Sequence, residues 1–580
     1  MKQKIWIPAL IFLVHLGLGL IATYPGIESA GESLIGGSDA AQNAWNLWWV
    51  NTACGQGNYF PFYTDQIYWP TGVSLAYHPL GLLNGWIGYL LQSGLGLNLA
   101  LTYNTITLLS FALTGLFTYY LAKYLVKDDM AAFVASIIFT FAPIRVSRVL
   151  YGNLEMYSTE FIPLAVLFLV KTLKEGKYYY AILSGLAFAA TVWMSLYLAV
   201  GLLLFFSLYF VIDIFSDKKS FGQKLFLFGL CGLVTLLLSM PVILPMVRDY
   251  PLFKDQANQI STAASNSADL LGFIIPDRSL SLLVKRIPGI NEQVTQIYSS
   301  FYGNPYEKTV FLGYSVIALT LLSLIWVTRR EKHIWVWIII SSIFIVLCLG
   351  PTLHIGGKEV LPHLPYEWIG QIPLIGFGRV PSRLGIILMM PLSLTCAYAI
   401  QALHARFRSI SKFPGLFFSA LVFIEFLSLP MVQYKLIGVI PDSYYAADLW
   451  KYDGAILDVP IDLYGAQGPG GTYMLYQTVH KHPIISGYIS RTPTSAIWVF
   501  EYPFLNELRA RIYSDQDTAY FPNDLLISAR SELEMLQATY IVLHNQKIRE
   551  EDLSNTRDAL NIILGDPVFE DKWIVVWVMK

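Results

Sequence analysis

The fold is decided by a stretch close to the amino terminus, IWIPALIFLVHLGLGLIATYPGIESAGESLIGGSDAAQNAWNLWW (5–49). Its first part, residues 5–22, contains no Asp, Glu, Lys or Arg and has the length of a membrane-spanning helix. Its second part is polar, rich in Gly and Trp, and carries Asp39 just before an amphipathic run. The stretch therefore predicts an integral membrane protein with a long first loop.

The composition of the whole chain agrees with this prediction. Of its 580 residues, 55% are hydrophobic and only 14% are charged, whereas soluble proteins keep about a quarter of their residues charged. The formal net charge of −1 leaves no basic excess for binding nucleic acid. The four cysteines make no spaced pair, so neither a disulfide framework nor a zinc site is indicated.

Apolar runs recur along the chain, and we predict about eleven membrane spans. They lie at about 5–22, 100–122, 130–144, 157–171, 178–195, 197–215, 224–246, 309–328, 333–350, 383–402 and 414–432. Lys and Arg gather on every second loop, which the positive-inside rule places in the cytoplasm. These loops contain Lys2/Lys4, Lys123/Lys127, Lys171/Lys174/Lys177, Lys218/Lys219/Lys224, Arg329/Arg330/Lys332 and Arg406/Arg408/Lys412. The prediction is a multi-pass protein of the cell membrane with a cytoplasmic amino terminus.

Three long loops then fall on the outer side, at 23–99, 247–308 and 351–382. Within the first loop, we expect residues 40–51 and 79–98 to form helices in the headgroup layer. The first of these segments contains Trp45, Trp48 and Trp49, and Trp favours that layer because one end of its ring system is apolar and the other is polar. A basic start followed by Ser29-Ala30 leaves cleavage of the first span as a signal peptide open.

The composition changes near residue 433. Residues 433–580 contain 12 Lys and Arg against 19 Asp and Glu, a net charge of 12 − 19 = −7 and a charged density near that of soluble proteins. Within them, 454–460, 538–545 and 572–579 have the pattern of buried strands, and 524–537 that of a helix. We therefore predict two domains, a transmembrane domain over 1–432 and an extracytoplasmic α/β domain over 433–580.

Asp39, in GGSDAAQNAWNLWW (36–49), is the first candidate for chemistry. It lies just past the outer end of the first span, where a carboxylate could act as a base. Because Ser38-Asp39 precedes a predicted helix, helix capping is the alternative. His78, in YWPTGVSLAYHPLGLLN (68–84), is a second candidate, either as a ligand contact or as a structural polar anchor.

Two pairs of arginines lie at outer membrane edges, where the topology rule disfavours them. Arg145 and Arg148 are in FAPIRVSRVLYGNLE (141–155), and Arg379 and Arg383 are in GFGRVPSRLG (376–385). Two guanidinium groups three or four residues apart can face one phosphate, or the side chains can extend to lipid headgroups instead. The polar residues that follow the first pair, Asn153 and Glu155, are candidates for the same site. Glu160 begins an apolar run, where a carboxylate needs a partner.

A last polar cluster lies in MLYQTVHKHPIISGYISRTP (474–493), with Gln477 and His480 as candidate binding residues and a surface loop as the alternative. His480 and His482 alternate as on one face of a strand, but two His side chains do not make a metal site. The chain contains no P-loop, no GxSxG, no HExxH and no dinucleotide fingerprint.

At these residues the chain resembles a known class. A cytoplasmic amino terminus, one span and a long outer loop with an early acidic residue resemble the GT-C class of membrane glycosyltransferases. The segments GGSDAAQNAWNLWW, YWPTGVSLAYHPL, FAPIRVSRVLYGNLE, FGRVPSR and QTVHKHPIISGYISR resemble bacterial and archaeal proteins of that class. The resemblance covers most of the chain and is clearest in the outer loops.

The resemblance implies a function. Such enzymes take a sugar from a polyprenyl-phosphate-linked or dolichyl-phosphate-linked donor on the outer face, and the aspartate of the first loop is the usual general base, which is Asp39 here. The outer arginines would then hold the lipid phosphate, His78 would contact the donor, and the outer domain would recognise a glycan, lipid or protein acceptor. Because Ala40 follows Asp39 in place of a second acidic residue, no cofactor is certain and a divalent cation stays an open alternative.

Two other functions compete with this one. A transporter of lipid-linked glycans would carry ionisable groups along the middles of its spans and show repeat symmetry, but the predicted middles are nearly free of Asp, Glu, Lys and Arg. A non-catalytic scaffold with an outer binding domain would tolerate changes at Asp39. The charges at outer membrane edges favour the glycosyltransferase.

Overall fold

The computed structural model describes residues 6–216, 220–254, 260–277, 281–287, 289–328, 331–372, 378–407, 413–436, 439–462, 470–513 and 521–579. Several residues of the predicted pattern lie outside them, namely Lys2, Lys4, Lys218, Lys219, Arg329, Arg330, Arg408, Lys412, Gly376 and Phe377. The chain forms two compact units. The first comprises Met1–Ala30, Asn104–Val242 and Asp255–Val432, and the second comprises Gly31–Tyr103, Ile243–Lys254 and Gln433–Lys580.

An apolar helix lies on each of the eleven predicted spans. These helices are α1 (Trp6–Ala22), α4 (Leu99–Val126), α5 (Asp129–Thr140), α8 (Phe161–Glu175), α9 (Tyr178–Met194), α10 (Leu196–Ser216), α11 (Phe221–Phe253), α15 (Tyr314–Trp326), α16 (Ile334–Cys348), α19 (Gly385–Arg406) and α20 (Phe413–Phe426). Six stretches within the described residues are long and apolar enough to cross a bilayer, and α1, α9, α15, α16 and α20 are shorter apolar helices. The chain is a multi-pass membrane protein.

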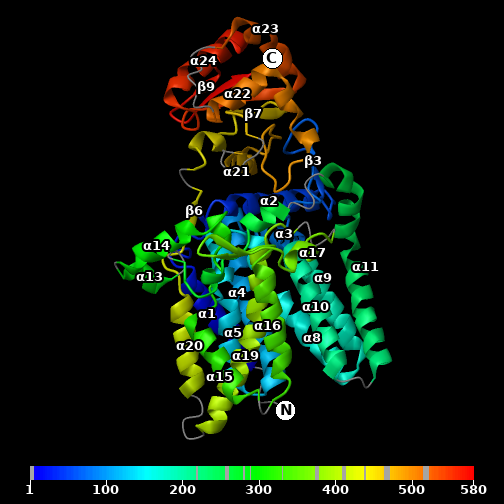
Figure 1. Ribbon diagram of the computed structural model, residues 1–580. Helices are drawn as coiled ribbons and strands as arrows, with labels where there is room; N and C mark the ends of the chain where they lie inside the picture. Colours follow the sequence, from blue (N-terminus) through cyan, green and yellow to red (C-terminus); the bar gives the residue numbers. More distant parts are fainter. Residues whose placement is uncertain are drawn as a thin grey trace. The chain divides into compact units, whose positions relative to one another are not determined.

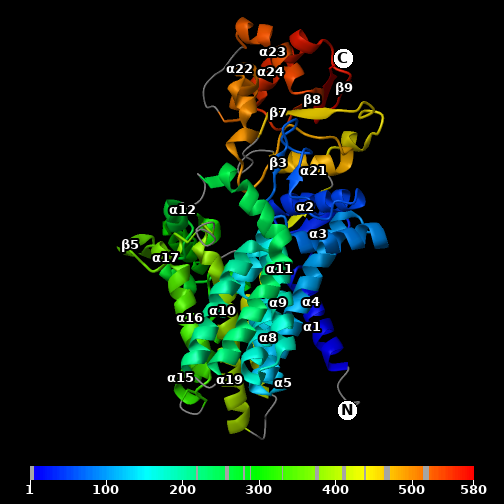
Figure 2. The ribbon, with the colours of Figure 1, turned by 90° about the vertical axis from the view of Figure 1, so that its right-hand side faces the viewer.

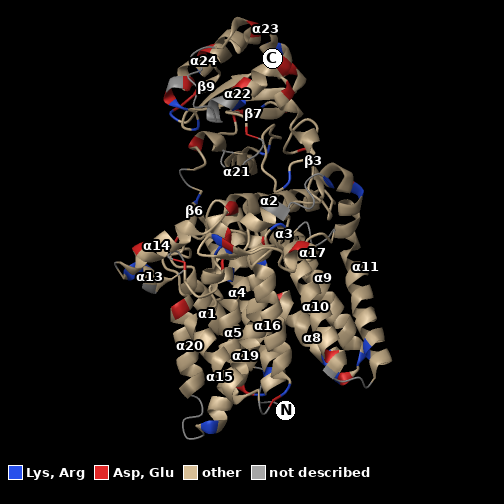
Figure 3. Ribbon diagram, viewed as in Figure 1, with Lys and Arg blue, Asp and Glu red and all other residues tan. Residues whose placement is uncertain are grey.

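The helices of the first unit run side by side (Figures 1 and 2). Helix α19 is buried along almost its whole length and packs against α5, α15 and α16, while α8 packs against α9. The middles of these helices are nearly free of charged residues, which gather at the helix ends (Figure 3). Such association relies on close packing rather than on the hydrophobic effect, because lipid tails are as apolar as the side chains.

The third predicted outer loop and residues 255–308 of the second belong to the first unit and are folded, whereas residues 247–254 belong to the second unit. The second loop contains α12 (Ile260–Ser265), η3 (Leu270–Phe273), α13 (Leu282–Arg286), α14 (Ile290–Ser300) and η4 (Pro305–Glu307). The third loop contains the hairpin of β4 (Leu353–Ile355) and β5 (Lys358–Leu361), followed by α17 (Tyr366–Ile369), and η5 (Pro381–Leu384) leads into α19. Asp269, which is 1% exposed, joins the loops because its carboxylate accepts hydrogen bonds from the backbone of Gly356 and Gly357.

The second unit is built on a mixed sheet in the order β7–β8–β10–β9. β7 (Ala455–Val459) is parallel to β8 (Ala538–His544), and β10 (Ile574–Val578) is antiparallel to both β8 and β9 (Phe569–Glu570). Helices α21 (Gly470–His480), α22 (Pro503–Tyr513), α23 (Asn523–Met535) and α24 (Glu550–Leu564) accompany the sheet. The three strands and the helix predicted within 433–580 coincide with β7, β8, β10 and α23.

From Gly31 onwards, the first predicted outer loop belongs to the second unit and folds with this sheet. β1 (Ser33–Ile35) pairs with β6 (Gln433–Lys435), and the backbone of 66–69 exchanges hydrogen bonds with 484–486, which in turn bonds to β7. Helix α2 (Asp39–Gly55) packs against α3 (Leu82–Tyr89) and α21. The second unit therefore contains residues from both sides of position 433, where the composition changes.

The tryptophans of 40–51 are buried within the protein. Trp45, Trp48 and Trp49 are 0%, 8% and 7% exposed. The Nε1–H of Trp45 donates to Gln477 Oε1 at 2.7 Å, because α21 packs against α2. An alternating apolar face and a Trp-rich composition are equally compatible with burial against protein, so the sequence alone did not distinguish the two. The other segment, 79–98, contains α3 and the π-helical turn η1 (Leu90–Gly94).

Gln477 joins α2, the first outer loop and α21 through one buried amide. Besides accepting from Trp45, its Nε2 donates to Gln66 O at 2.5 Å and to His482 O at 3.0 Å. We predict that Gln477→Met lowers the unfolding free energy by about 1–3 kcal/mol, because it leaves buried polar groups unpaired. Thermal unfolding of the purified protein would measure the effect, with Thr478→Ala on the same helix as the control. An unchanged melting temperature would contradict the proposed junction.

Candidate functional site

The first predicted arginine pair lies on a short helix whose ends are specified by the sequence. Helix α6 (Pro143–Tyr151) begins with Pro143, which suits the first turn of a helix, and ends at Gly152 in the left-handed conformation. Helix α7 (Leu154–Tyr157) follows at once. Arg148 lies in the last turn of α6 and is buried.

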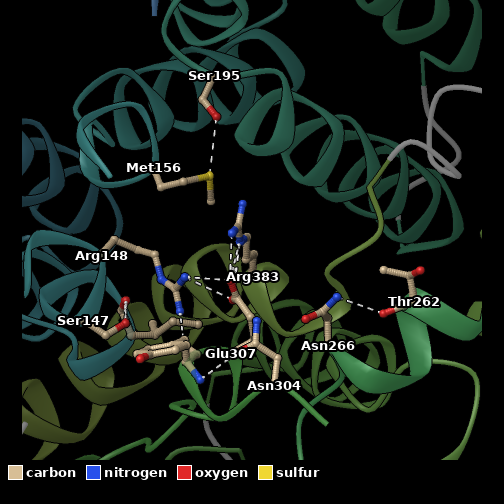
Figure 4. A network of polar contacts seen from close by, with 11 residues as sticks. Ser147, Arg148, Met156, Ser195, Thr262, Asn266, Asn304, Glu307 and Arg383 are labelled. Carbon is tan, nitrogen blue, oxygen red and sulfur yellow. Dashed lines mark hydrogen bonds and ion pairs between the residues drawn. The ribbon is translucent and has the colours of Figure 1, made fainter. Parts of the chain in front are cut away.

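Arg148 meets Arg383 through a carboxylate that the sequence analysis had not singled out, that of Glu307 (Figure 4). Arg148 Nη1 lies 3.0 Å from Glu307 Oε1 and 3.0 Å from Oε2, and Arg148 Nη2 donates to Tyr306 O at 3.0 Å. Arg383 Nη2 lies 2.7 Å from Glu307 Oε1, and Arg383 Nε lies 3.3 Å from the same oxygen. One arginine of each predicted pair thus shares one carboxylate.

The electrostatics of this cluster favour an ionised carboxylate. Burial alone would raise the pKa of Glu307, but the guanidinium groups of Arg148 and Arg383 outweigh burial and lower that pKa to about 2. Two cations and one anion leave these three side chains with a net charge of +1. Glu155, on α7, adds a negative charge that acts on Arg383.

Arg145, by contrast, belongs to a separate network inside the helix bundle. Its Nε donates to Tyr157 O and Thr159 Oγ1, its Nη1 to Thr140 O and its Nη2 to Ser110 Oγ, all within 3.0 Å. Ser110 Oγ also donates to Glu160 Oε2 at 2.8 Å, which supplies the partner that a carboxylate in an apolar run requires. The structure therefore does not bring Arg145 and Arg148 to a common partner.

The remaining predicted residues of the first unit lie near these arginines in sequence. Asn153 precedes α7 and its backbone N–H donates to Arg148 O at 2.9 Å. Glu155 is 6% exposed. Arg379 is partly exposed and lies in the segment before η5.

Asp39, in the second unit, is the first residue of α2 and is partly exposed. Ser38 occupies the N-cap position without a side-chain capping hydrogen bond, so the capping alternative in its usual form does not apply to Ser38. A negative charge in the first helical turn is stabilised by the helix dipole. Asn43 Nδ2 donates to the backbone oxygen of Asp39 at 3.0 Å, which fixes the first turn of the helix.

His78 has protein partners at both ring nitrogens. Its Nε2 lies 2.9 Å from Asn46 Oδ1, and the backbone N–H of Ser490 donates to its Nδ1 at 3.5 Å. Burial lowers the pKa of His78 to about 3, so the ring is neutral, in agreement with one donating and one accepting nitrogen. A contact between His78 and a donor substrate would require one of these partners to leave.

Gln477 and His480 are interior residues of the second unit, on α21. Helix α21 continues to His480, so the expected strand carrying His480 and His482 on one face is wrong. The alternation of His480 and His482 suggested a strand, but the helix ends at His480 and only His482 lies beyond it. Burial, together with the neighbouring His482 and His544, lowers the pKa of His480 well below its ordinary value.

No group of three or more His, Cys, Asp or Glu side chains that could hold a metal ion is found in the described residues. Glu307 is the functional candidate that sequence reasoning missed. Its signal was an acidic residue, in NPYEK (304–308), directly before an apolar run and in a predicted outer loop, as Arg379 is.

The model of a family described as a domain of unknown function, DUF6311, matches residues 13–428. The chain belongs to the DUF6311 family. No curated protein sequence matches the chain. The matched range includes Asp39, His78 and the four candidate arginines, Arg145, Arg148, Arg379 and Arg383.

Solved structures of glycosyltransferases share the fold. The arabinofuranosyltransferase AftD from Mycobacteria aligns with 100% of this chain at a TM-score of 0.54 and 14% identity, and the chain spans 40% of that enzyme's length. The oligosaccharyltransferase of Archaeoglobus fulgidus in its apo form aligns with 94% of this chain at a TM-score of 0.50 and 10% identity, over 70% of its own length. The resemblance to the GT-C class is thereby confirmed at the level of fold.

The same archaeal enzyme tethered to an acceptor peptide containing the NVT sequon aligns equally well, with a TM-score of 0.50, 11% identity, and 94% and 70% of the two chains covered. At such low identities the likeness shows the fold alone.

The depressed pKa of Glu307 generates a prediction about acid stability. A carboxylate whose pKa is lower in the folded than in the unfolded protein stabilises the fold above its unfolded pKa, near 4.3, and this contribution is lost as the pH falls towards about 2. Relative to Glu307→Gln, the native protein should be more stable by roughly 3 kcal/mol at pH 6, and most of the difference should vanish by pH 2.5. Thermal unfolding of both proteins at the two pH values would check this, and a difference independent of pH would contradict it.

Proposed function

We propose that the protein is a membrane glycosyltransferase. It moves a sugar from a polyprenyl-phosphate-linked donor to an acceptor hydroxyl on the outer face of the cell membrane, with inversion at the anomeric carbon. The observation that supports this most directly is the buried Arg148–Glu307–Arg383 cluster in a chain with the GT-C fold. Two guanidinium groups close to the ends of apolar helices suit a donor whose phosphate is at the headgroup layer and whose tail is in the bilayer.

The arginines would act on the leaving group. As the bond from the anomeric carbon to the phosphate oxygen breaks, the lipid phosphate gains negative charge, so fixed guanidinium groups stabilise the transition state more than the ground state. Arg383 is the better candidate for direct contact, because its side chain is 20% exposed whereas that of Arg148 is 2% exposed. Arg145 is left out of this role, since all three of its nitrogens already have protein acceptors.

Asp39 would act as the general base. The acceptor hydroxyl attacks the anomeric carbon from the face opposite the phosphate, and its proton passes to the Asp39 carboxylate as the new bond forms. A carboxylate is a weak base towards a free alcohol, but the proton becomes acidic only as the oxygen bonds to carbon, and such assistance contributes about 10²–10⁴-fold. The departing phosphate leaves with the electrons of the broken bond.

The predicted topology belongs to the same proposal. All eleven apolar helices would cross the membrane, with the amino terminus in the cytoplasm and the domain over 433–580 outside. That domain would recognise the acceptor, which is a glycan, a lipid or a protein. The packing of α21 against α2 supports a role for the domain in holding the loop that carries Asp39.

We expect purified protein to transfer labelled sugar from one member of a panel of polyprenyl-phosphate-sugars, and Asp39→Asn to reduce the rate by about 10²–10⁴-fold. Asparagine keeps the size of the side chain and loses the basic carboxylate. The measurement is sugar transfer by the two proteins at equal concentration.

The matched control is Asp65→Asn, which removes an exposed carboxylate of the same loop. It should leave both the rate and the melting temperature unchanged. Equal transfer by wild type and Asp39→Asn would assign the base to another residue. A rate loss in Asp39→Asn accompanied by an equal loss of thermal stability would indicate a structural role for Asp39.

A further inference from the structure

Glu307 is held in place by the backbone around it. In η4, the Asn304 side chain accepts from the backbone N–H of Tyr306, and the next residue, Lys308, donates from Nζ to Ser265 O at 3.0 Å and Ser267 O at 2.6 Å. Gly303 has a φ of +85°, and a Cβ there would come within 2.2 Å of Ser265 O. These contacts fix the backbone on both sides of Glu307 without involving either arginine.

The Glu307 carboxylate contacts a defined part of each guanidinium group. It takes the Nε–Nη2 edge of Arg383 and the Nη1 of Arg148, whose Nη2 is bound by Tyr306 O. The Arg383 guanidinium also lies 5.0 Å from the centre of the Tyr197 ring. A carboxylate on one edge and a ring on one face fix the orientation of the planar Arg383 guanidinium group. The same contacts would not orient the ammonium group of a lysine.

These contacts leave defined donors unused. Within the residues that the structure describes, nothing accepts from Arg383 Nη1, and Arg148 Nε is buried without a partner. Figure 4 shows one nitrogen of Arg383 pointing away from Glu307, on the side of Met156 and Ser195. Arg383 thus keeps one edge on Glu307 and presents the other.

We propose that Glu307 is a positioning residue, which holds Arg383 so that its Nη1 edge faces the phosphate group of a lipid phosphate. This inference rests on the proposed function. It predicts that anion binding changes in the opposite direction from the one that charge alone predicts when the Glu307 charge is removed. Removing a negative charge beside two arginines should strengthen anion binding if only charge counts. If Glu307 positions Arg383, the same change should weaken binding, because the two guanidinium groups repel each other and lose their common anchor.

The test uses the full-length protein in detergent micelles, with farnesyl phosphate as the probe and farnesol as the uncharged control. We expect wild type to prefer farnesyl phosphate, and Glu307→Gln to bind it about tenfold more weakly. Glu425→Gln is the matched control, since Glu425 on α20 accepts from the backbone of Tyr314 and Ser315 at the start of α15. It should lower the melting temperature without changing the affinity for the probe.

A double variant, Arg148→Met with Glu307→Gln, covers the case in which the single variant folds poorly. It removes one buried charge of each sign, so its melting temperature should recover towards that of wild type while its affinity for farnesyl phosphate stays weak. Wild-type affinity in the double variant would show that Glu307 only neutralises Arg148, and would overturn the inference.

Two other results separate this inference from the proposed function. Equal or tighter binding of farnesyl phosphate by Glu307→Gln would overturn the positioning role and leave the phosphate site standing. Equal response of wild type to farnesyl phosphate and farnesol would overturn the phosphate site itself, and the positioning role with it.

Discussion

Pairing of buried charge is the constraint on which the outer end of the first unit depends. A guanidinium group away from water is costly unless it has a counter-ion and hydrogen-bond acceptors. Arg148, Glu307 and Arg383 come from three parts of the chain, α6, η4 and η5, and can satisfy one another only when those parts meet. Asp269 does the same for the hairpin β4–β5. Polar contacts, as well as apolar packing, therefore order the outer loops of this unit.

The second unit depends on backbone pairing instead. β1 with β6, and 66–69 with 484–486, attach the first outer loop to the sheet that begins at β7. The buried amide of Gln477 then connects α21 to Trp45 on α2. Residues 433–580 differ from the rest of the chain in composition, yet they are part of the support of the helix that begins at Asp39. A change at the carboxyl-terminal sheet would be transmitted to that helix through these contacts.

Physical reasons separate what the sequence predicted from what it did not. In a bilayer, the backbone N–H and C=O groups of an apolar run must form hydrogen bonds within the run itself. A helix does this, and an apolar helix lies on each predicted span. Strands β7, β8 and β10 could also be predicted from the sequence, because buried strands are continuous apolar runs. The burial of Trp45 and the pairing of Arg148 with Arg383 through Glu307 could not be predicted from the sequence. Both depend on contacts between residues that lie far apart in the chain, and no local sequence pattern indicates such contacts.

The arginines themselves show why position in a motif is a weaker guide to function than the state of each donor. Arg145 and Arg148 are three residues apart on α6 and looked equivalent in sequence. In the structure every nitrogen of Arg145 donates to a protein acceptor, and these hydrogen bonds connect α4, α5 and α7. Among the described residues, Arg148 Nε has no acceptor and Arg383, whose side chain is 20% exposed, has none at Nη1. Under the proposed function, Arg383 of the second predicted pair would contact the ligand, and Arg148 of the first pair would help to hold the cluster in place.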